Sequence, residues 1–303
     1  MLIPVNGKGV SFAEPKILNS QIKEDPVILE ALEEFRDDLK QYQVPIGNTT
    51  VDLIKHYDSE CNIGNLVTDA GRKCYWNDTT ISFQNNGGIR YEFKQTVFLI
   101  CVPSPRNFST SAFIFRSNIL KGELTYEDVF AILPFNNSID RVTMKGKEIR
   151  DTLEDAVSSL CPSQTCSAGG FLQVSGIKMK VLVTDNNSGH RIQSLKTLCS
   201  PNNDNEYCDL EDEKVYNVAL CSFLATQVHR EKTNLSKFVK DRQIGIPDYQ
   251  CLKEYIEEKK TISPTVEGRI VIDYEETENG SNTIQHNFYF LLLSLFVQGM
   301  FFK

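Results

Sequence analysis

Histidine is scarce in this sequence, and the motifs of several enzyme classes are missing. Only four histidines occur among 303 residues, and none stands near an acidic residue in a metal-binding spacing such as HExxH or DxH. A hydrolytic site with two metal ions needs about five to seven His, Asp and Asn ligands on converging loops. The sequence also has no GxSxG elbow, no P-loop and no Ser-His-Asp order. We therefore expect neither catalytic residues nor metal ligands in this chain.

Runs of basic residues are also absent. The net charge is −8 at pH 7, and no stretch gathers the clustered lysine and arginine that a nucleic-acid surface requires. We therefore expect no nucleic-acid partner. The hydrophobic content of 41% and the charged content of 24% are those of a globular protein, and 303 residues could form one large domain or two modest ones.

Cysteine pairs of the CxxC type are missing from a chain with nine cysteines, which argues against a structural zinc site. Cys161 and Cys166 bracket one short polar segment, and Cys199 and Cys208 bracket another. This spacing favours two local disulfides of an exported protein over the alternative of buried free thiols. The odd number of cysteines leaves at least one without a partner.

Asn-x-Ser/Thr sequons are, by contrast, abundant. Seven occur, where about three would be expected by chance, so the excess indicates passage through the secretory route. The candidates for glycosylation are Asn48, Asn77, Asn136, Asn186 and Asn234, with further sequons at Asn107 and Asn279.

The two ends of the chain carry different signals. The first residues, MLIPVNGKGVSFAEP, have neither the basic nor the apolar region of a signal peptide. Residues 288–302 are almost all apolar but number only 15, fewer than the about 20 that a spanning helix needs. With a polar spacer and the small residues Asn279, Gly280 and Ser281, they resemble a glycosylphosphatidylinositol attachment signal, and a buried C-terminal helix is the alternative. We expect an extracellular or cell-surface protein, carrying this anchor if the full-length protein has a signal peptide.

Local signals place several helices. Asp25 and Pro26 should open an amphipathic helix, with an acidic N-cap and proline at its first position. TYED at residues 125–128 has the spacing of a capping box, which predicts a short helix that ends before Pro134. Hydrophobic spacing predicts further helices from about residue 62, over 149–160 and over 251–256.

Strands alternate irregularly with these helices, which predicts an α/β fold with a mixed sheet. Residues 177–183 alternate as a half-buried strand should, and residues 215–223 have the pattern of a buried strand. Further strands are expected over 79–84 and 268–274. Residues 96–120 are more apolar and richer in serine than their surroundings, and they are either a long inserted hairpin or a segment that does not belong.

The decamer ISFQNNGGIR ends a short β-prone run in asparagines, glycines and an arginine. Gly87 and Gly88 would let backbone N–H groups approach an anion, Asn85 adds an amide, and Arg90 adds a forked donor. These groups suit a loop that binds a ligand, and the alternative is an ordinary Asn-Gly turn between strands.

Two phenylalanines lie at unusual places. Phe135 follows a proline in a polar loop, and Phe223 stands at the end of the buried strand over 215–223. Core packing is the alternative role for each of them.

Five motifs then occur in one order: CNIGNLVTDA, NNGGIR, TYEDVFAILPFNN, GGFLQVSG and VEGRI. Together they resemble the C-terminal domain of the ecto-5′-nucleotidase and insect apyrase family, and PKILNSQIKEDPVILEALEEF resembles the end of that family's first domain with its linker helix. The family links GGIR to TYED directly, so residues 96–120 look like an added segment, as a translated intron would be. The resemblance implies a division into the end of a metallophosphoesterase domain (1–24), a linker helix (25–45), a substrate-binding domain (46–274) and a spacer with an anchor signal (275–303).

The resemblance also implies an activity. The family hydrolyses extracellular nucleotides, with two divalent metals (zinc-type, or calcium in apyrases) in its N-terminal domain and the base stacked between two phenylalanines of its C-terminal domain. Phe135 and Phe223 match this pair, while Asn85 and Arg90 match loop residues that contact base, ribose and phosphate. The chain would then bind AMP-, ADP- or ATP-like nucleotides and hold no cofactor itself.

Some positions depart from the family pattern. His229 stands about where the family has an aspartate for the ribose hydroxyls, and His56 and Tyr57 stand where it has a cysteine and an arginine. Cys61 is thereby left without its usual disulfide partner. The sequence thus predicts a nucleotide-binding domain unable to hydrolyse alone. The alternative is a pseudoenzyme that serves as a binding or dimerisation module, which could form a homodimer.

Overall fold

The computed structural model describes residues 23–74, 77–90, 119–161, 170–184, 190–226 and 240–275, together with the strands over 4–5, 8–9, 96–102 and 109–115. The chain divides into two compact units, Met1–Val44 and Pro45–Lys303. His229, Cys166, the sequons at Asn107, Asn186, Asn234 and Asn279, and the whole C-terminal tail lie outside the described residues.

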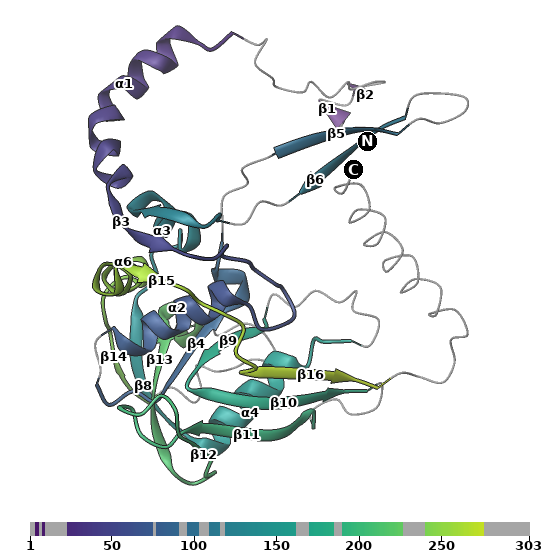
Figure 1. The fold of residues 1–303 in the computed structure, drawn as a ribbon, viewed down its shortest axis with the longest axis vertical. Helices are drawn as coiled ribbons and strands as arrows, with labels where there is room; N and C mark the ends of the chain where they lie inside the picture. Colours follow the sequence, from purple (N-terminus) through teal and green to yellow (C-terminus); the bar gives the residue numbers. More distant parts are fainter. Residues whose placement is uncertain are drawn as a thin grey trace, which may run out of the picture. The chain divides into compact units, whose positions relative to one another are not determined.

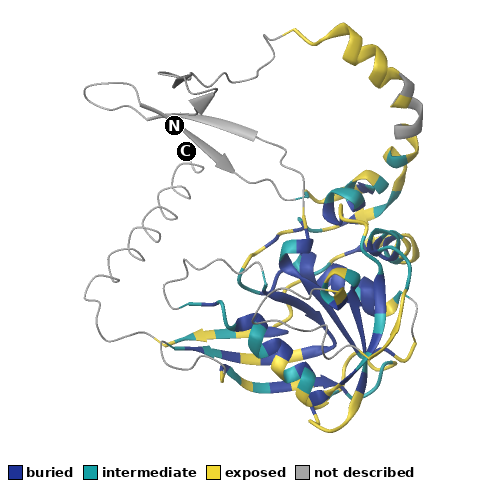
Figure 2. Cartoon of the chain, turned by 180° about the vertical axis from the view of Figure 1, so that it is seen from behind, coloured by how far each residue is buried: buried dark blue, intermediate teal, exposed yellow. Residues whose placement is uncertain are grey.

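The first unit contains α1 (Pro26–Lys40), followed by the 3₁₀ turn η1 (Gln41–Gln43), and the short strands β1 (Pro4–Val5) and β2 (Lys8–Gly9), which pair antiparallel. The predicted helix start is confirmed, because the Asp25 carboxylate accepts a hydrogen bond from the Val27 backbone N–H at 2.9 Å. The described side chains of α1 are exposed, as Figure 2 shows. The cap and the spacing thus predicted α1 correctly, although none of its described side chains is buried.

A mixed five-stranded sheet is the centre of the second unit (Figure 1). Its order is β14 (Lys240–Gln243), β8 (Ile139–Lys145), β13 (Val215–Cys221), β4 (Ile81–Asn85) and β9 (Leu172–Ser175). Strand β13 pairs parallel with β4 and antiparallel with β8. This arrangement confirms the α/β class with a mixed sheet.

Alternating side chains of the five-stranded sheet enter two cores. In β13, Tyr216, Val218 and Leu220 pack with α4 (Gly146–Val157) and the second sheet, whereas Ala219 and Cys221 face the opposite side. On that opposite side α2 (Asn62–Lys73) lies across β4, β9 and β13, and α6 (Asp248–Lys259) packs against α2 (Figure 1). The central strands are buried on both faces, which gives them a nearly continuous dark-blue colour in Figure 2.

The second sheet has the order β12 (Tyr207–Asp209), β11 (Ile192–Leu198), β10 (Ile177–Val183) and β16 (Ile270–Tyr274). The prediction of a half-buried strand at 177–183 is confirmed, since Ile177, Met179, Val181 and Val183 are buried while Lys178 and Lys180 between them are exposed. Strand β16 joins β10 in parallel.

A third sheet, β15 (Thr261–Ile262), β3 (Pro45–Thr49) and β7 (Gly122–Thr125), leads into α3 (Tyr126–Ile132). The predicted capping box is confirmed, because the Thr125 and Asp128 side chains each bond the other's backbone N–H. Between η2 (Asn86–Gly88) and β7, the strands β5 (Thr96–Val102) and β6 (Ser109–Phe115) pair antiparallel. That residues 96–120 are an added segment stays a prediction.

Hydrogen bonds and an ion pair join the segments that contain the sequence motifs CNIGNLVTDA and VEGRI. The Glu60 carboxylate, which precedes the first motif, accepts hydrogen bonds from the backbone N–H groups of Glu267 and Ile270. Arg269 forms a bidentate ion pair with Asp69, with both N–O distances at 2.8 Å. These bonds link parts of the chain about 200 residues apart and thereby fix β16 against α2.

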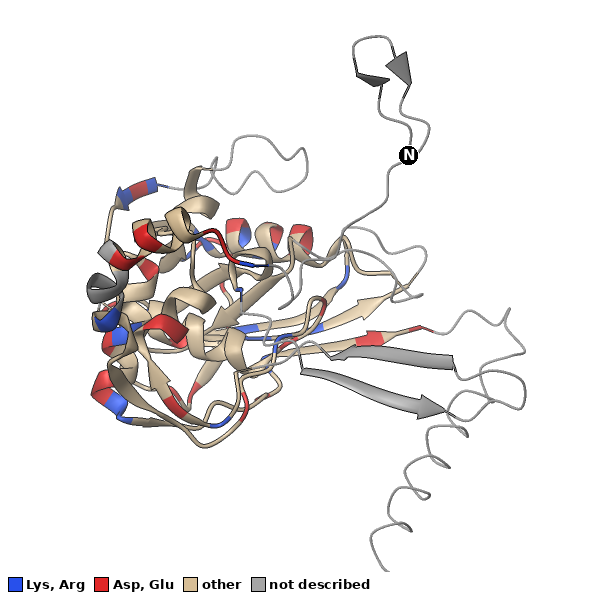
Figure 3. Ribbon diagram, turned by 90° about the horizontal axis from the view of Figure 1, so that it is seen from above, with Lys and Arg blue, Asp and Glu red and all other residues tan. Residues whose placement is uncertain are grey.

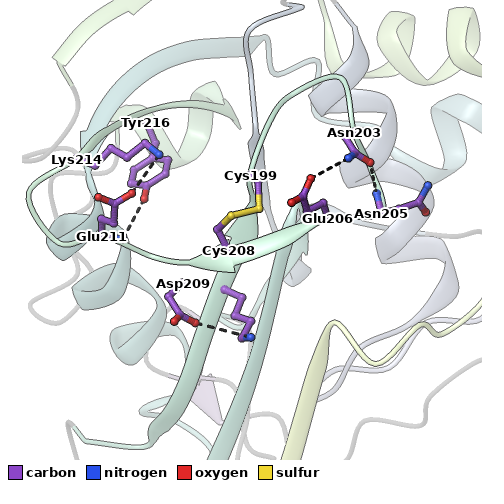
Figure 4. Close-up of a disulfide and its surroundings, with 10 residues drawn as sticks. Cys199, Asn203, Asn205, Glu206, Cys208, Asp209, Glu211, Lys214 and Tyr216 are labelled. Carbon is purple, nitrogen blue, oxygen red and sulfur yellow. Dashed lines mark hydrogen bonds and ion pairs between the residues drawn. A yellow bond between two sulfur atoms is a disulfide. The ribbon is translucent and has the colours of Figure 1, made fainter.

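Disulfides close one short loop and one very long one. Cys199–Cys208 joins the end of β11 to β12, as predicted, and Asn203 and Glu206 bond within the closed loop (Figure 4). Cys161 is disulfide-bonded, but its predicted partner lies outside the described residues. Cys74–Cys251, which joins the end of α2 to α6, was not predicted. Cys61 is free and buried, in agreement with the loss of its usual partner.

Charges of both signs are interspersed over the described helices and strands (Figure 3). Ion pairs such as Arg141–Asp78 and Lys253–Glu257 join them on the surface. Among the helices of the described residues, none is both long and apolar enough to cross a membrane.

Candidate functional site

All the described residues that the sequence analysis proposed for ligand binding lie near one edge of the five-stranded sheet, the edge formed by the ends of its strands. The parallel strands β4 and β13 both end there, and β8 begins there, since Cys221 at the end of β13 pairs with Ile139 at the start of β8. Ligands of open α/β sheets bind outside the carboxyl ends of such strands. The edge is therefore the candidate functional site.

The NNGGIR loop follows β4 directly and is held by the buried side chain of Asn86. The Asn86 amide donates to the His56 carbonyl at 2.6 Å, and its backbone N–H donates to the Phe171 carbonyl at 2.8 Å. Gly88 packs closely in this loop, because an added Cβ would lie 2.5 Å from the Gln84 side-chain nitrogen and would have to displace that side chain. The loop is thus a fixed 3₁₀ turn rather than a loose connection.

Asn85, at the end of β4, is largely buried beside Cys221. Burial raises the pKa of the Cys221 thiol to about 12, so at neutral pH it is protonated and donates to the Asn85 side-chain oxygen, 3.5 Å away. This contact joins the ends of the two parallel strands. It orients the Asn85 amide at the edge.

Arg90 leaves the loop at the surface. Its backbone N–H donates to the Ile132 carbonyl of α3 at 2.7 Å, and its guanidinium carbon lies 5.3 Å from the centre of the Phe135 ring. That distance is within the range of a cation–π contact. The structure thus brings together Arg90 and Phe135, which are 45 positions apart in the sequence.

Phe135 and Phe223 lie in two segments of the chain that bond to each other. The Ser138 backbone N–H donates to the Ser222 hydroxyl at 3.1 Å, and the Ser222 backbone N–H donates to the Ser138 carbonyl at 2.7 Å. Phe135 is 53% exposed and Phe223 is 41% exposed, so the alternative of core packing does not describe either ring. We call Arg90, Phe135 and Phe223 the phenylalanine site.

One prediction about this site was wrong in detail. Phe223 does not end the strand, because β13 stops at Cys221 and Phe223 lies in α5 (Ser222–Thr226). The hydrogen bonds of Ser222 to Ser138 turn the chain there and carry the ring away from the core. His229, the expected ribose contact, lies outside the described residues.

Further residues that support the site were missed from the sequence. Asp140 is fully buried, accepts a bond from the Ser138 hydroxyl at 2.7 Å, and pairs with Arg242 at 2.6 Å. Asp248, at the start of α6, donates its backbone N–H to the Asn137 carbonyl. Burial raises the pKa of the Asp248 carboxyl to about 7.

The candidate glycosylation residues Asn48, Asn77 and Asn136 are all exposed. Asn136 directly follows Phe135 and has a φ of 53°, a left-handed conformation in which asparagine is enriched. Within the described residues, no group of three or more His, Cys, Asp or Glu side chains could hold a metal ion.

Comparisons with known proteins show the family of this chain. Residues 45–235 match the family model described as the 5′-nucleotidase C-terminal domain. The chain is similar to Protein 5NUC of Lutzomyia longipalpis, at 30% identity over 89% of this chain and 46% of the relative. It is also similar to the 5′-nucleotidase of Rattus norvegicus, at 30% identity over 89% of this chain and 44% of the relative. The chain thus spans less than half the length of these two curated relatives.

Two solved structures are also similar to this chain. The 5′-nucleotidase precursor from Thermus thermophilus superposes with a TM-score of 0.62 at 28% identity, over 84% of this chain and 44% of that one. The NAD nucleotidase of Haemophilus influenzae, with a TM-score of 0.61 at 17% identity over 83% of this chain and 42% of that one, shares the fold.

Proposed function

Because this chain belongs to the family of 5′-nucleotidase C-terminal domains, we propose that it is the nucleotide-binding part of a hydrolase that removes phosphate from extracellular nucleotides. The nucleoside base would stack between Phe135 and Phe223, and Arg90 and Asn85 would contact the ribose and phosphate. Gly87 and Gly88 allow the backbone of the same loop to lie close to the ligand.

One observation carries this proposal. Phe135, in a loop, and Phe223, in α5, both expose their rings, their segments are joined by the Ser138–Ser222 hydrogen bonds, and the Arg90 guanidinium lies beside the Phe135 ring. Exposed aromatic faces suit a planar base, and base–aromatic stacking contributes about 1–3 kcal/mol per base. An arginine next to them suits a phosphate group.

Catalysis would need metal ions, and the described residues of this chain contain no group of three or more His, Cys, Asp or Glu side chains that could bind one. The zinc-type or calcium ions of the reaction would belong to the part of the relatives that this chain does not match. The whole protein would work outside the cell, and a lipid anchor formed at Asn279, Gly280 or Ser281 would hold it at the membrane. This chain alone would bind nucleotide without hydrolysing it.

Calorimetric titration with adenosine and AMP tests the proposal. We expect both ligands to bind, and either Phe135→Ala or Phe223→Ala to weaken binding about tenfold or more, as the loss of one stacking face implies. Phe35→Ala is the matched control, because this ring on α1 is 57% exposed and belongs to the other compact unit. It should leave the affinity unchanged.

Absence of binding at about millimolar ligand, which corresponds to a binding free energy weaker than about 4 kcal/mol, would contradict the proposal. That result would favour the alternative, a family member that serves as a binding or dimerisation module without a nucleotide site.

A further inference from the structure

We propose that Lys55 is a positioning residue of the phenylalanine site, which fixes the backbone that carries Arg90 and adds a buried positive charge beside it. This inference rests on the proposed nucleotide-binding function. It adds a preference to that function, namely for phosphorylated nucleosides over nucleosides without a phosphate.

Two hydrogen bonds fasten the segment around Lys55 to the NNGGIR loop. The Lys55 ammonium donates to the Ile89 carbonyl at 2.6 Å, and the Asn86 amide donates to the His56 carbonyl at 2.6 Å. The bonds therefore hold the loop near both of its ends. Lys55 is only 8% exposed and Ile89 is fully buried, so water competes weakly for this bond.

A continuous set of contacts connects Lys55 with the phenylalanine site. Ile89 is followed by Arg90, whose backbone N–H bonds the Ile132 carbonyl and whose guanidinium lies 5.3 Å from the Phe135 ring. A shift of the Ile89 carbonyl would move the Arg90 backbone with it. Lys55 thus acts through Arg90 and touches no ligand itself.

The buried charge has a second effect. The Lys55 ammonium lies 4.4 Å from the centre of the Tyr57 ring, and the ring face stabilises its positive charge. Charges that are shielded from water interact more strongly than exposed ones. An ammonium next to the Arg90 backbone should therefore raise the affinity for an anionic ligand more than that for a neutral one.

Three variants of Lys55 separate these effects, with calorimetric affinities for AMP and adenosine as the measurement. We expect Lys55→Met to weaken AMP binding about tenfold or more, the usual effect of losing a hydrogen bond from a charged group, and to weaken adenosine binding by less than about threefold. Lys55→Arg should restore most of the AMP affinity. Lys55→Gln keeps a donor for Ile89 but lacks the charge, so it should fold well and still lower the ratio of AMP to adenosine affinity.

Lys178→Met is the matched control. The Lys178 ammonium also lies 4.4 Å from a tyrosine ring, that of Tyr207, and its removal changes the net charge equally. It lies on β10 of the second sheet, and it should leave the affinity ratio unchanged. If Lys55→Met and Lys55→Gln keep the wild-type ratio, the inference is overturned.

Hydrogen exchange of the Arg90 amide in the ligand-free protein makes the result independent of nucleotide binding. We expect Lys55→Met to speed this exchange about tenfold, and Lys178→Met to leave it unchanged. If the wild-type protein binds neither ligand, the proposed function fails. Unchanged exchange in Lys55→Met would then refute the positioning role as well.

Discussion

Phe135 and Phe223 expose aromatic faces that folding alone would tend to cover. Their exposure follows from particular bonds: Ser138 and Ser222 hold the Phe135 loop to the start of α5, and the left-handed turn at Asn136 redirects the chain after Phe135. The sequence singled out Phe135 in a polar loop and Phe223 at the end of a buried strand, and the family resemblance matched both to the stacking pair. It could not identify the anchoring role of Asn86, because the partner carbonyl of His56 is 30 positions away and nothing local links the two.

Arg269 joins the first and last sequence motifs through a buried ion pair. It is buried and binds Asp69 in bidentate geometry, with additional bonds to Glu267 and the Val174 carbonyl. Arg269→Met should lower the free energy of unfolding by about 3 kcal/mol, because the carboxylate of Asp69 loses its partner. Urea denaturation measures the change.

Lys253→Met provides the comparison for Arg269. Lys253 pairs with Glu257 one turn away on the exposed side of α6, and such pairs contribute less than about 1 kcal/mol. Equal losses for the two variants would show that the buried network is not what holds β16 to α2.

At the scale of elements, the strength of a local pattern decided which predictions succeeded. Strand β10 was predicted because its buried and exposed residues alternate, and α3 because a capping box starts it. Strand β8 was missed because Asp140 and Arg141 occur at its start. Asp140 is buried there with Arg242, which is 102 positions away, as its charged partner. Tertiary pairing thus overrode the local signal.

The two described disulfides should differ in what they contribute. Cys74–Cys251 spans 177 positions and Cys199–Cys208 spans nine. In the chain-entropy model these loops correspond to about 5 and about 2.5 kcal/mol. Replacing both cysteines of the long pair by alanine should therefore lower the urea midpoint more than the same change in the short pair. The opposite order would show that local packing outweighs loop length.

Asp248 at the start of α6 should make stability depend on pH. Burial raises its pKa in the folded protein to about 7, while the unfolded carboxyl has a pKa of about 4. Between these values the folded state binds more protons than the unfolded state, so this group's contribution is complete below about pH 4 and is lost as the pH rises to about 7. Asp248→Asn should remove that part of the pH dependence.

Unfolding free energies at several pH values between about 4 and 7 measure this effect. Asp209→Asn serves as the control, because the Asp209 side chain is 88% exposed and its ion pair with Lys196 is long, with 3.8 Å between the two charged atoms. The difference between Asp248→Asn and wild type should grow steadily over this range. A constant difference would mean that the carboxyl is ionised throughout.

At the scale of the whole molecule, the buried apolar clusters all come from the second unit, between Leu53 and Ile270. The sequence predicted the fold class and the order of motifs. It did not predict that Glu60 and Arg269 would link the first and last motifs, because contacts between residues about 200 positions apart produce no pattern in the local sequence.

The purified chain should not release phosphate from AMP or ATP when Zn²⁺, Co²⁺ or Ca²⁺ is added, because its described residues contain no metal-binding group. A phosphate-release assay with a complete 5′-nucleotidase as positive control makes the measurement. Turnover by this chain would contradict the division of labour that we propose.

The loop of Phe135 has a further consequence, because Asn136 is exposed and begins the sequon Asn136-Asn137-Ser138. A glycan on Asn136 would stand one residue from the stacking ring. A chain made in bacteria, without N-glycans, would present the bare ring, whereas a fully occupied glycoform would present it beside a sugar chain. Two preparations of identical sequence should then differ in adenosine affinity until an endoglycosidase makes them equal. The host that makes the protein thereby becomes one of the determinants of its affinity.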